Sequence, residues 1–522
     1  MFSFDSLRNA FASNIVRTTT KPNLPPPPTI HDAASPPINL MRGWPNPSLL
    51  PADLIREAAN KALSDTTIST AGLLYGPDPG YEPCREAIAA WLTDFYRSDN
   101  NAAPVTASRL CITGGASQNL GNLLAVYTDP AYTRNIWIVA PAYMLAFRIF
   151  EDAGFGEKMN GIPEDDKGID LAALRRGLEK SEAEARGRKG SERPVYKPER
   201  KRAKVYKHVL YCVPTFSNPS SRTMSLEHRT ELVRIAREYD VLLIADDVYD
   251  FLQWPGDASA DGSLDAAMQT AHLPRLVDID RDLEGGADRP DADGFGNACS
   301  NGTFSKIVGP GVRVGWVEGT DKFTYGVSQT GTTASGGAPS NLTSTYLTHL
   351  LASGSLTTHI SALLRPAYAS RSHTLHTAIH THLLPLGFSL PQTDRQGVFG
   401  GYFVWLSLPP EMSAGVLARR CREEAGVIVA EGGIFEVPEE KGDGEEEEGD
   451  EGEKEEGESL QGGFDGFVRL CFAWEEEGRL EEGVRLVGEV AGRMIGEAGG
   501  GSVGLRGGSG DGGEGGGLEV YK

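Results

Sequence analysis

The sequence predicts an α/β protein built on a mostly parallel sheet, and three observations lead to this fold class. Short apolar runs rich in Val, Ile and Leu occur at 135–140, 208–214 and 241–247, as in strands that are buried on both faces. Apolar residues recur at helical spacing just before the third run. Polar residues gather directly after the runs, and parallel sheets bind their ligands outside the carboxyl ends of the strands.

The helix before the third run is the reason to expect parallel strands. Leu232, Ile235, Ala236 and Tyr239 are spaced i, i+3, i+4 and i+7, which places them on one face of a helix. Ser225 precedes this helix and is expected to cap its first turn. A strand, a helix and a further strand in succession imply parallel strands with helices packed on the sheet.

Length and charge limit the class of protein. The chain has 522 residues, more than one ordinary core accommodates, so two domains are expected. Its formal net charge is −22, and residues 439–458 hold 13 acids and 2 lysines, which is half of that charge. We expect this segment to be a disordered, solvated insertion. The remaining surface is only modestly acidic, which argues against a nucleic-acid partner, and no run approaches the ~20 apolar residues of a membrane span.

Other segments lack a regular apolar period and are expected outside the core. Residues 180–204 and 255–298 are predicted to be loop insertions, and 1–37 and the glycine-rich 496–522 to be disordered. The six cysteines form no CxxC pair, which indicates a reducing compartment without a disulfide framework or a zinc site. We therefore expect a cytoplasmic protein without a metal. A mitochondrial protein is the alternative, because the N-terminus has the phenylalanines, arginines and hydroxyls of a presequence.

The first polar cluster is the stretch "ITGGASQ", residues 112–118. Gly114 and Gly115 predict a turn that leads into a helix. Free amides at a helix N-terminus, together with the Ser117 hydroxyl, can bind an anion. A plain turn between a strand and a helix is the alternative, which this stretch alone does not exclude.

The next two clusters carry an amide and a carboxylate. Asn218 precedes Pro219, which favours an extended residue and holds the amide at the end of the strand. Asp246 ends a strand that should be buried, where a carboxylate costs several kcal/mol unless it has a cationic or hydrogen-bonded partner. Tyr249 follows three residues later. A helix cap is one interpretation of Asp246, and a partner such as a protonated pyridine nitrogen is the other.

The fourth cluster is "TFSKIVGPGVR", residues 303–313. Thr303 and Ser305 can donate to phosphate oxygens, and Arg313 can bind them with two nitrogens. Lys306 lies among these groups, and an amine near other cations has the lowered pKa that a Schiff-base lysine requires. A phosphate, a protonated ring nitrogen, a phenolic oxygen and an aldehyde together describe one ligand, pyridoxal phosphate.

With these motifs in this order, the chain resembles class I/II aminotransferases of pyridoxal-phosphate fold type I. The resemblance runs from about Asn39 to Glu489 outside the insertions. The residues of these motifs are most similar to those of fungal members related to 2-aminoadipate, kynurenine and aromatic aminotransferases. It implies a large cofactor-binding domain, 71–345, with a mostly parallel seven-stranded sheet between helices, and a smaller α+β domain formed by 38–70 and 346–495.

The resemblance also assigns site residues, with further support from "NLMRGWPNP", "LLYGPDPGYEP", "APAYMLAF" and "GFVRLCFAW". The residues that would bind the cofactor are Tyr75, Ala116, Ser117, Tyr143, Asn218, Asp246, Tyr249, Thr303, Ser305, Lys306 and Arg313. Gly43 and Asn218 would lie near the substrate, and Arg469 would clamp its α-carboxylate. Tyr75 would reach the phosphate of a neighbouring subunit, which implies a homodimer. Ser220–Ser221 stand where the family has Thr-Gly, a difference that we expect to have no effect.

The reaction implied by the resemblance moves an amino group from an L-amino acid to a 2-oxo acid, with 2-oxoglutarate as the expected acceptor. Lys306 would hold the cofactor as a Schiff base and then act as the general base at Cα. Asp246 would keep the ring nitrogen charged, and Tyr249 would bond the ring oxygen. Two alternatives stay open. One is a β-lyase with the same cofactor residues, and the other is a non-catalytic cofactor-binding regulator, which we expect to carry a helix-turn-helix that this sequence lacks.

Overall fold

The computed structural model describes residues 36–97, 103–187, 196–198, 200–255, 272–391, 398–438 and 463–500. The predictions of disorder at 1–37, at 439–458 and at the end of the chain fall almost entirely outside these residues. No helix in the described ranges has the length and apolar character that crossing a membrane would require.

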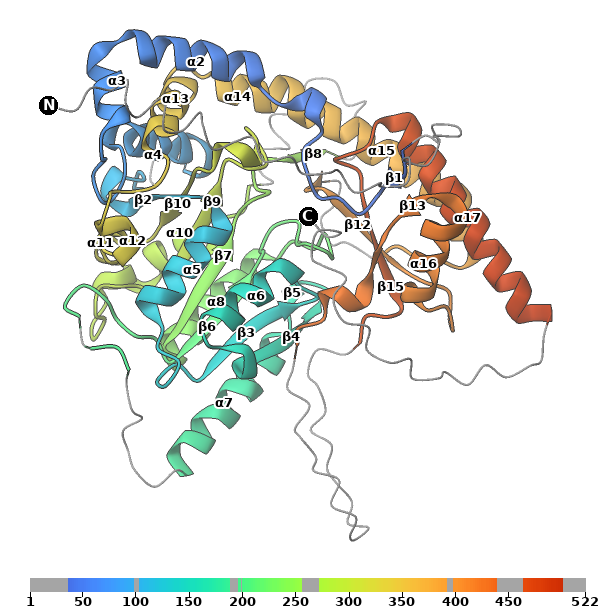
Figure 1. The fold of residues 1–522 in the computed structure, drawn as a ribbon. Coiled ribbons are helices and arrows are strands. Elements are labelled where there is room, and N and C mark those ends of the chain that lie inside the picture. Colours follow the sequence, from blue (N-terminus) through green and yellow to red (C-terminus); the bar gives the residue numbers. More distant parts are fainter. Residues whose placement is uncertain are drawn as a thin grey trace, which may run out of the picture. The chain divides into compact units, whose positions relative to one another are not determined.

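The central sheet confirms the predicted α/β fold class (Figure 1). Its strand order is β2-β10-β9-β7-β6-β3-β4-β5. The strands span Leu110–Thr113 (β2), Gly315–Glu318 (β10), Ala298–Thr303 (β9), Val241–Asp246 (β7), His208–Cys212 (β6), Asn135–Ala140 (β3), Met159–Asp165 (β4) and Gly168–Ile169 (β5). The five strands from β9 to β4 are parallel, whereas β10 is antiparallel to both neighbours and the two-residue β5 is antiparallel to β4. The eighth strand is this short β5, beyond the seven that the resemblance implied.

Both faces of the sheet are buried, as the apolar runs predicted. Leu210 and Leu243 face one core, which contains Leu174 of helix α7 and Leu232 of helix α8. Tyr211 and its neighbours on the same face contact a second core that contains residues of α5 and α6. Helices α5 and α6 lie over this second face in Figure 1. The helices around the sheet are Glu82–Tyr96 (α4), Ala116–Tyr127 (α5), Phe147–Asp152 (α6), Leu171–Gly187 (α7), Leu226–Tyr239 (α8), Leu276–Asp282 (α10), Asp321–Ser328 (α11) and Gly331–Ala334 (α12).

The C-terminal part forms a second layered region. Strands Phe403–Ser407 (β12), Phe467–Cys471 (β15) and Ala430–Glu431 (β14) make an antiparallel sheet, and helices Arg365–His382 (α15), Ala414–Ala425 (α16) and Glu477–Gly500 (α17) belong to the same region. Strand Ile38–Asn39 (β1) pairs with Val427–Ile428 (β13), so the first described strand joins this region. Gln253–Pro255 (β8) pairs with Val398–Gly400 (β11). Four more helices complete the described fold: Ala52–Ser64 (α2), Thr66–Leu73 (α3), Asn341–Ala352 (α13) and Ser355–His359 (α14).

The helix predicted before the third run is confirmed. Helix α8 begins directly after Ser225, whose side chain accepts a hydrogen bond from the amide of His228. Leu232, Ile235 and Ala236 are buried on its inner face.

Three predicted boundaries are wrong in the described residues. Helix α7 continues into the expected loop 180–204 as far as Gly187, because the stretch has good helix formers and Leu174 and Leu178 anchor it on the sheet. Helix α10 and a 3₁₀ segment, Leu283–Asp288, lie within the expected loop 255–298. Helix α17 continues past Gly496 to Gly500. The seven-residue α10 escaped detection because its buried residues include Asp278 and Asp280, which interrupt any apolar period.

The parallel strands bring the polar clusters to one edge of the sheet. Cys212 at the end of β6 lies opposite Ala245 of β7, and Asp246 lies opposite Asn301 of β9. The segments that follow β6, β7 and β9 therefore emerge at the same edge.

Candidate active site

All the predicted site residues except Tyr75 line one cavity of about 480 Å³. The predicted residues in its lining are Gly43, Ala116, Ser117, Tyr143, Asn218, Asp246, Tyr249, Thr303, Ser305, Lys306, Arg313 and Arg469. They come from the carboxyl ends of the central strands, the start of α5, the segment after β1, and β15. The structure thus brings segments from most of the chain to one place.

One end of the cavity is suited to an anion. Helix α5 begins at Ala116 without a side-chain cap, so the first amides of the helix have no partner within it. Gly115, just before the helix, has a φ of 101°, which favours glycine. A Cβ atom at this position would lie 3.0 Å from Nη2 of Arg313, so the glycine also allows the arginine to approach. The positive end of the helix and a guanidinium therefore meet here.

Two hydroxyls adjoin the same end of the cavity. Oγ1 of Thr303 and Oγ of Ser305 lie 2.8 Å apart, and both residues line the cavity. Arg313 is held by the carbonyl oxygens of Gly114, at 2.6 Å, and Pro310, at 3.0 Å. Since it forms no ion pair with a described carboxylate, its charge is available to a phosphate.

Lys306 is a half-buried amine that forms no ion pair with an acid in the described part of the chain. Its Nζ donates to the carbonyl oxygen of Gly43 at 2.9 Å and lies 5.2 Å and 5.9 Å from the ring centres of Tyr402 and Tyr249. Burial lowers the pKa of Lys306 to about 8; among the smaller effects, Cys471 and Asp246 raise the pKa and Arg469 lowers it. Gly43 is required for close packing, because a Cβ there would lie 2.8 Å from the ring of Phe403. Because its pKa is about 8, a large share of the Lys306 amine is neutral near pH 8, as a nucleophile or base requires.

Asp246 is a buried carboxylate in the lining of the same cavity. It is 8% exposed and accepts hydrogen bonds from the hydroxyl of Tyr211 at 2.8 Å and from Nδ2 of Asn301 at 3.3 Å. Burial raises its pKa to about 6, against the lowering effects of the Tyr211 hydrogen bond and the charge of Lys306. Such a carboxylate is suited to a cationic ligand group, since a cation would lower its pKa and offset the cost of burial.

Arg469 is the third buried charge of the cavity. Its Nη1 donates to Oδ1 of Asn218 and its Nη2 to the carbonyl oxygen of Met41, both at 2.6 Å, while its buried Nε has no hydrogen-bond partner among the described residues. The guanidinium lies over the rings of Phe403 at 4.1 Å and Phe435 at 4.8 Å. Burial lowers the pKa of Arg469 to about 10, so it stays charged at neutral pH and can bind a carboxylate.

Sequence reasoning missed the apolar wall and the residues behind Asp246. The wall consists of Met41, Trp44, Pro45, Met144, Leu145, Val213, Val248 and Phe403. Single apolar residues beside a motif carry no signal that separates them from the core. Tyr211 could have been found, because the two-residue period of a strand places it on the same face as Val209 and Val213.

Tyr75 lies apart from the cavity within one chain. It is 90% exposed and lines a separate surface hollow with Gly336 and Asn341. Its predicted contact with the phosphate of a second subunit stays a prediction.

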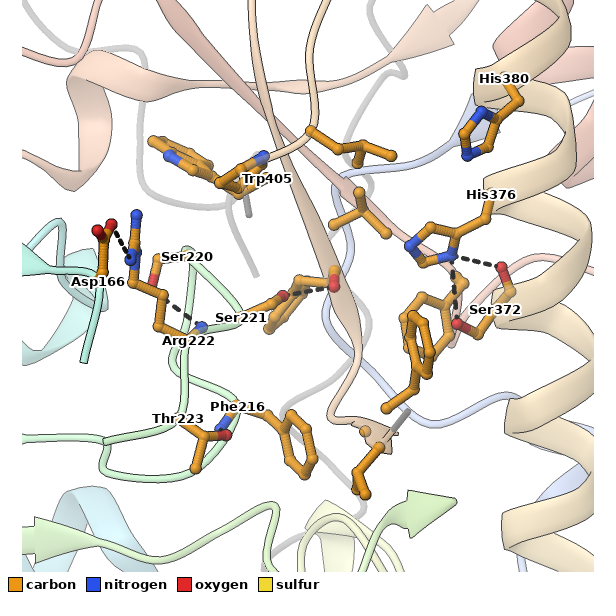
Figure 2. Close-up of a pocket in the computed structure, with 18 residues that line it drawn as sticks. Asp166, Phe216, Ser220, Ser221, Arg222, Thr223, Ser372, His376, His380 and Trp405 are labelled. Atoms are coloured by element: carbon orange, nitrogen blue, oxygen red, sulfur yellow. Dashed lines mark hydrogen bonds and ion pairs between the residues drawn. The ribbon is translucent and has the colours of Figure 1, made fainter. Parts of the chain in front are cut away.

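Figure 2 shows a second pocket of about 270 Å³. Its lining shares Phe403 with the active-site cavity. The loop after Asn218 forms one side of it, where Arg222 points toward Asp166 and the hydroxyl of Ser221 donates to the carbonyl oxygen of Phe403 at 2.5 Å. Helix α15 forms the other side with His376. Within the described ranges, no group of three or more His, Cys, Asp or Glu residues could hold a metal ion.

Comparison with known proteins identifies the family. The model for aminotransferase class I and II matches residues 46–444. The chain is also 36% identical over 415 residues to the uncharacterised protein YER152C of Saccharomyces cerevisiae, which covers 77% of this chain and 88% of that protein. The chain belongs to the aminotransferase class I and II family. The resemblance inferred from the motifs is therefore confirmed.

More distant relatives of this aminotransferase agree. It is 24% identical over 446 residues to the 2-aminoadipate transaminase of Thermus thermophilus, which covers 85% of this chain and 88% of that one. The solved α-aminoadipate aminotransferase of Thermus thermophilus, complexed with N-(5′-phosphopyridoxyl)-L-leucine, has a TM-score of 0.64, 24% identity, and covers 88% of this chain and 93% of that one. The fold is therefore that of fold type I, and the enzyme is a pyridoxal-phosphate-dependent aminotransferase.

The cavity of this aminotransferase fits pyridoxal phosphate group by group. The uncapped start of α5, two hydroxyls and Arg313 suit the phosphate, and Lys306 suits the aldehyde. Asp246, buried without a cation at bonding distance, suits the ring nitrogen. Asn218 and Tyr249 line the cavity and can donate to the ring oxygen.

Proposed function

We propose that this enzyme transfers the amino group of an L-amino acid to a 2-oxo acid, with Lys306 as the catalytic amine. The observation that carries the proposal is the gathering of half-buried Lys306 with buried Asp246 and Arg469 in one cavity, each without an ion pair among the described residues. Buried charges that lack partners are costly, and such groups concentrate at functional sites.

Different residues are assigned to the phosphate and to the ring nitrogen of pyridoxal phosphate. Arg313, Thr303 and Ser305 would hold the phosphate, and Asp246 would keep the ring nitrogen protonated. Bound pyridoxal phosphate supplies an electron sink for the electron pair that remains at the substrate Cα when its proton leaves. The charge of Asp246 favours this function because it stabilises the positive ring nitrogen.

Lys306 and Arg469 act on the substrate. Arg469 exchanges its bonds to Asn218 and Met41 for a bidentate contact with the α-carboxylate, which fixes the direction of the Cα–H bond. Lys306 would hold the cofactor at its aldehyde, and its amine would take the proton from the substrate Cα. A pKa of about 8 for this amine is close to the pH at which a general base is most effective.

The apolar wall supports a class of amino donor. Trp44, Met144, Leu145, Val213 and Phe403 face the cavity. Arg313 and Arg469 are its arginines in the described lining, and both are assigned to other groups. We therefore propose donors with apolar or aromatic side chains, in line with the relative named aromatic-amino-acid aminotransferase 1 of Thermococcus litoralis.

The exposed Tyr75 supports a homodimer with sites at the subunit interface. A tyrosine that is 90% exposed beside Leu73 and Leu74, which are 67% and 65% exposed, is unusual for a free surface. A dimer would cover these side chains and could bring Tyr75 to the phosphate of the other subunit.

The test is a panel of L-amino acids with 2-oxoglutarate or pyruvate, read by the new amino acid and the new 2-oxo acid. We expect aromatic and large aliphatic donors to give glutamate, and Lys306→Ala to lose turnover while the protein stays folded. Release of ammonia and pyruvate from a donor with a β-leaving group, without glutamate, would instead indicate a β-lyase. Full turnover by Lys306→Ala would reject the assigned amine.

A further inference from the structure

Two hydrogen-bond donors lie directly behind Asp246. The hydroxyl of Tyr211, in β6, is 2.8 Å from Oδ2 of Asp246, and Nδ2 of Asn301, in β9, is 3.3 Å from Oδ1. Tyr211 is 2% exposed and Asn301 is 1% exposed, so water does not substitute for either contact. The strands that flank β7 on both sides thus each direct one donor at the same carboxylate.

The orientation of the Asn301 amide follows from its other partners. Its Nδ2 also lies 3.1 Å from the carbonyl oxygen of Ala116, which can only accept a hydrogen bond. Its Oδ1 is 2.9 Å from Nδ2 of Asn119, a residue that is fully buried in α5. The amide group that faces Asp246 is therefore the NH₂ group, and the carboxylate must accept.

A carboxylate that only accepts hydrogen bonds is stabilised in its ionised form, whereas burial favours the protonated form. We propose that Tyr211 and Asn301 are positioning residues that keep Asp246 ionised and oriented toward the ring nitrogen of pyridoxal phosphate. Asn301 also contacts Ala116 at the start of α5, so it links the carboxylate to the phosphate end of the cavity. This inference rests on the proposed role of Asp246.

Other titratable groups surround the carboxylate and have to be considered in any pH measurement. Asp246 interacts with Lys306 from the segment after β9, and with Tyr143, Tyr249, Cys212 and Cys299 from the neighbouring segments. The pKa values of both cysteines and both tyrosines are raised by burial, so these groups stay neutral between pH 5 and 8. The buried Asp247 is adjacent in the chain, and its pKa is also raised by burial.

The test measures the dissociation constant of pyridoxal phosphate from the folded protein between pH 5 and 8, by quenching of protein fluorescence. Tyr211→Phe removes one hydroxyl and is expected to raise the dissociation constant about tenfold at pH 7, as for loss of a hydrogen bond to a charged group. It should also move the acid-side loss of affinity to higher pH, because removing the donor raises the pKa of Asp246.

The matched control is Tyr206→Phe. Tyr206 is fully buried just before β6, and its hydroxyl donates to the carbonyl oxygen of Gly296 at 2.6 Å, away from Asp246. It should show a similar loss of thermal stability without a change in cofactor affinity or in its pH profile. Equal affinities of Tyr211→Phe and the control at every pH would overturn the proposal for Tyr211.

A second variant, Asn301→Leu, keeps the inference testable if Tyr211→Phe does not fold. We expect a smaller increase in the dissociation constant, about threefold, because the amide is uncharged and its contact is longer. Asp246→Asn tests the role of Asp246 separately from the roles of Tyr211 and Asn301. If it weakens cofactor binding and the two positioning variants do not, the role of Asp246 stands and this inference fails; if it has no effect, the role of Asp246 fails.

Discussion

The protein buries two groups of charges, and they differ in how their members are paired. In the first group, Arg275 is bonded to Asp278 at 2.9 and 3.0 Å and lies 2.8 Å from Glu318, over the ring of Tyr96 at 4.0 Å. In the second, Lys306, Asp246 and Arg469 share a cavity and bond mainly to uncharged partners.

The pKa shifts of the two groups have opposite signs. Burial by itself would lower the pKa of Arg275 and raise that of Asp278, but the combined charges and hydrogen bonds around them, including Glu318 for Arg275 and Arg97 for Asp278, shift both pKa values the other way. In the cavity, burial outweighs the other effects: it lowers the pKa of Lys306 and Arg469 and raises that of Asp246. In the paired cluster, removing one member leaves a buried charge without its partner, so the fold depends on every member, whereas charges without such partners are typical of ligand-binding sites.

Removing a charge from the unpaired group should harm catalysis and spare the fold. Arg469→Met is expected to lower kcat/KM about a thousandfold, since the α-carboxylate loses its cation. The free energy of unfolding should change by less than about 1 kcal/mol, because the variant also removes a buried guanidinium that has no carboxylate partner. Steady-state kinetics and urea unfolding measure the two quantities. Equal losses of stability and activity would contradict the comparison.

Removing a charge from the paired group should do the reverse. Arg275→Met leaves Asp278 and Glu318 buried without their main cation, at a cost of about 3 to 4 kcal/mol in the free energy of unfolding. The kcat/KM of the protein that remains folded should stay within about twofold of the wild type. Urea unfolding and active-site titration before each assay provide the measurements, and an unchanged stability would show that the cluster does not support the fold.

The effect of Lys306 on the free energy of unfolding should depend on pH. In the cofactor-free protein, the pKa of Lys306 is about 8, below its ordinary value of 10.5, so the folded state binds fewer protons than the unfolded state between these values. The destabilisation that this lysine causes is therefore complete below pH 8 and disappears as the pH rises past 10.5.

Lys306→Met should accordingly raise the free energy of unfolding by about 2 to 3 kcal/mol at pH 7, and by progressively less at higher pH. Guanidinium unfolding of both cofactor-free proteins from pH 7 to 10.5 measures the difference. A difference that grows with pH would show that the sign is wrong.

The smallest effect concerns the loop that carries Asn218. Ser221 has a φ of 59°, a backbone region that favours glycine, and its hydroxyl donates to the carbonyl oxygen of Phe403. Ser221→Ala keeps the left-handed strain and loses this bond, so we expect a loss of about 1 to 2 kcal/mol in the free energy of unfolding. Ser221→Gly loses the bond but also the strain and should cost less. Urea unfolding compares the three proteins, and a larger loss for Gly than for Ala would contradict this account.

The expectation that the Ser220–Ser221 difference has no effect stays a prediction, which these variants test. A serine at a positive φ is strained, and the structure offers its hydroxyl a partner in β12 that a glycine could not use. Nothing in the sequence near 221 indicates that residue 403 lies beside it, because such a partner is defined only by the fold.

The sequence by itself determined the elements with local signals. The runs that became β3, β6 and β7 were recognisable because strands buried on both faces need continuous apolar residues. Helix α8 was recognisable by its period and its Ser225 cap. The residues that line the cavity were recognisable because pyridoxal phosphate demands particular groups, which the family places in fixed motifs.

Only the tertiary structure decided the features that depend on partners distant in the chain. Helix α10 was hidden because buried Asp278 and Asp280 interrupt its apolar pattern, and their partners Arg97 and Arg237 come from other parts of the chain. The contact of Tyr211 and Asn301 with Asp246 depends on the order of β6, β7 and β9 in the sheet. Residue types specify which groups are present, but strand order and burial determine which groups meet and whether each keeps its charge.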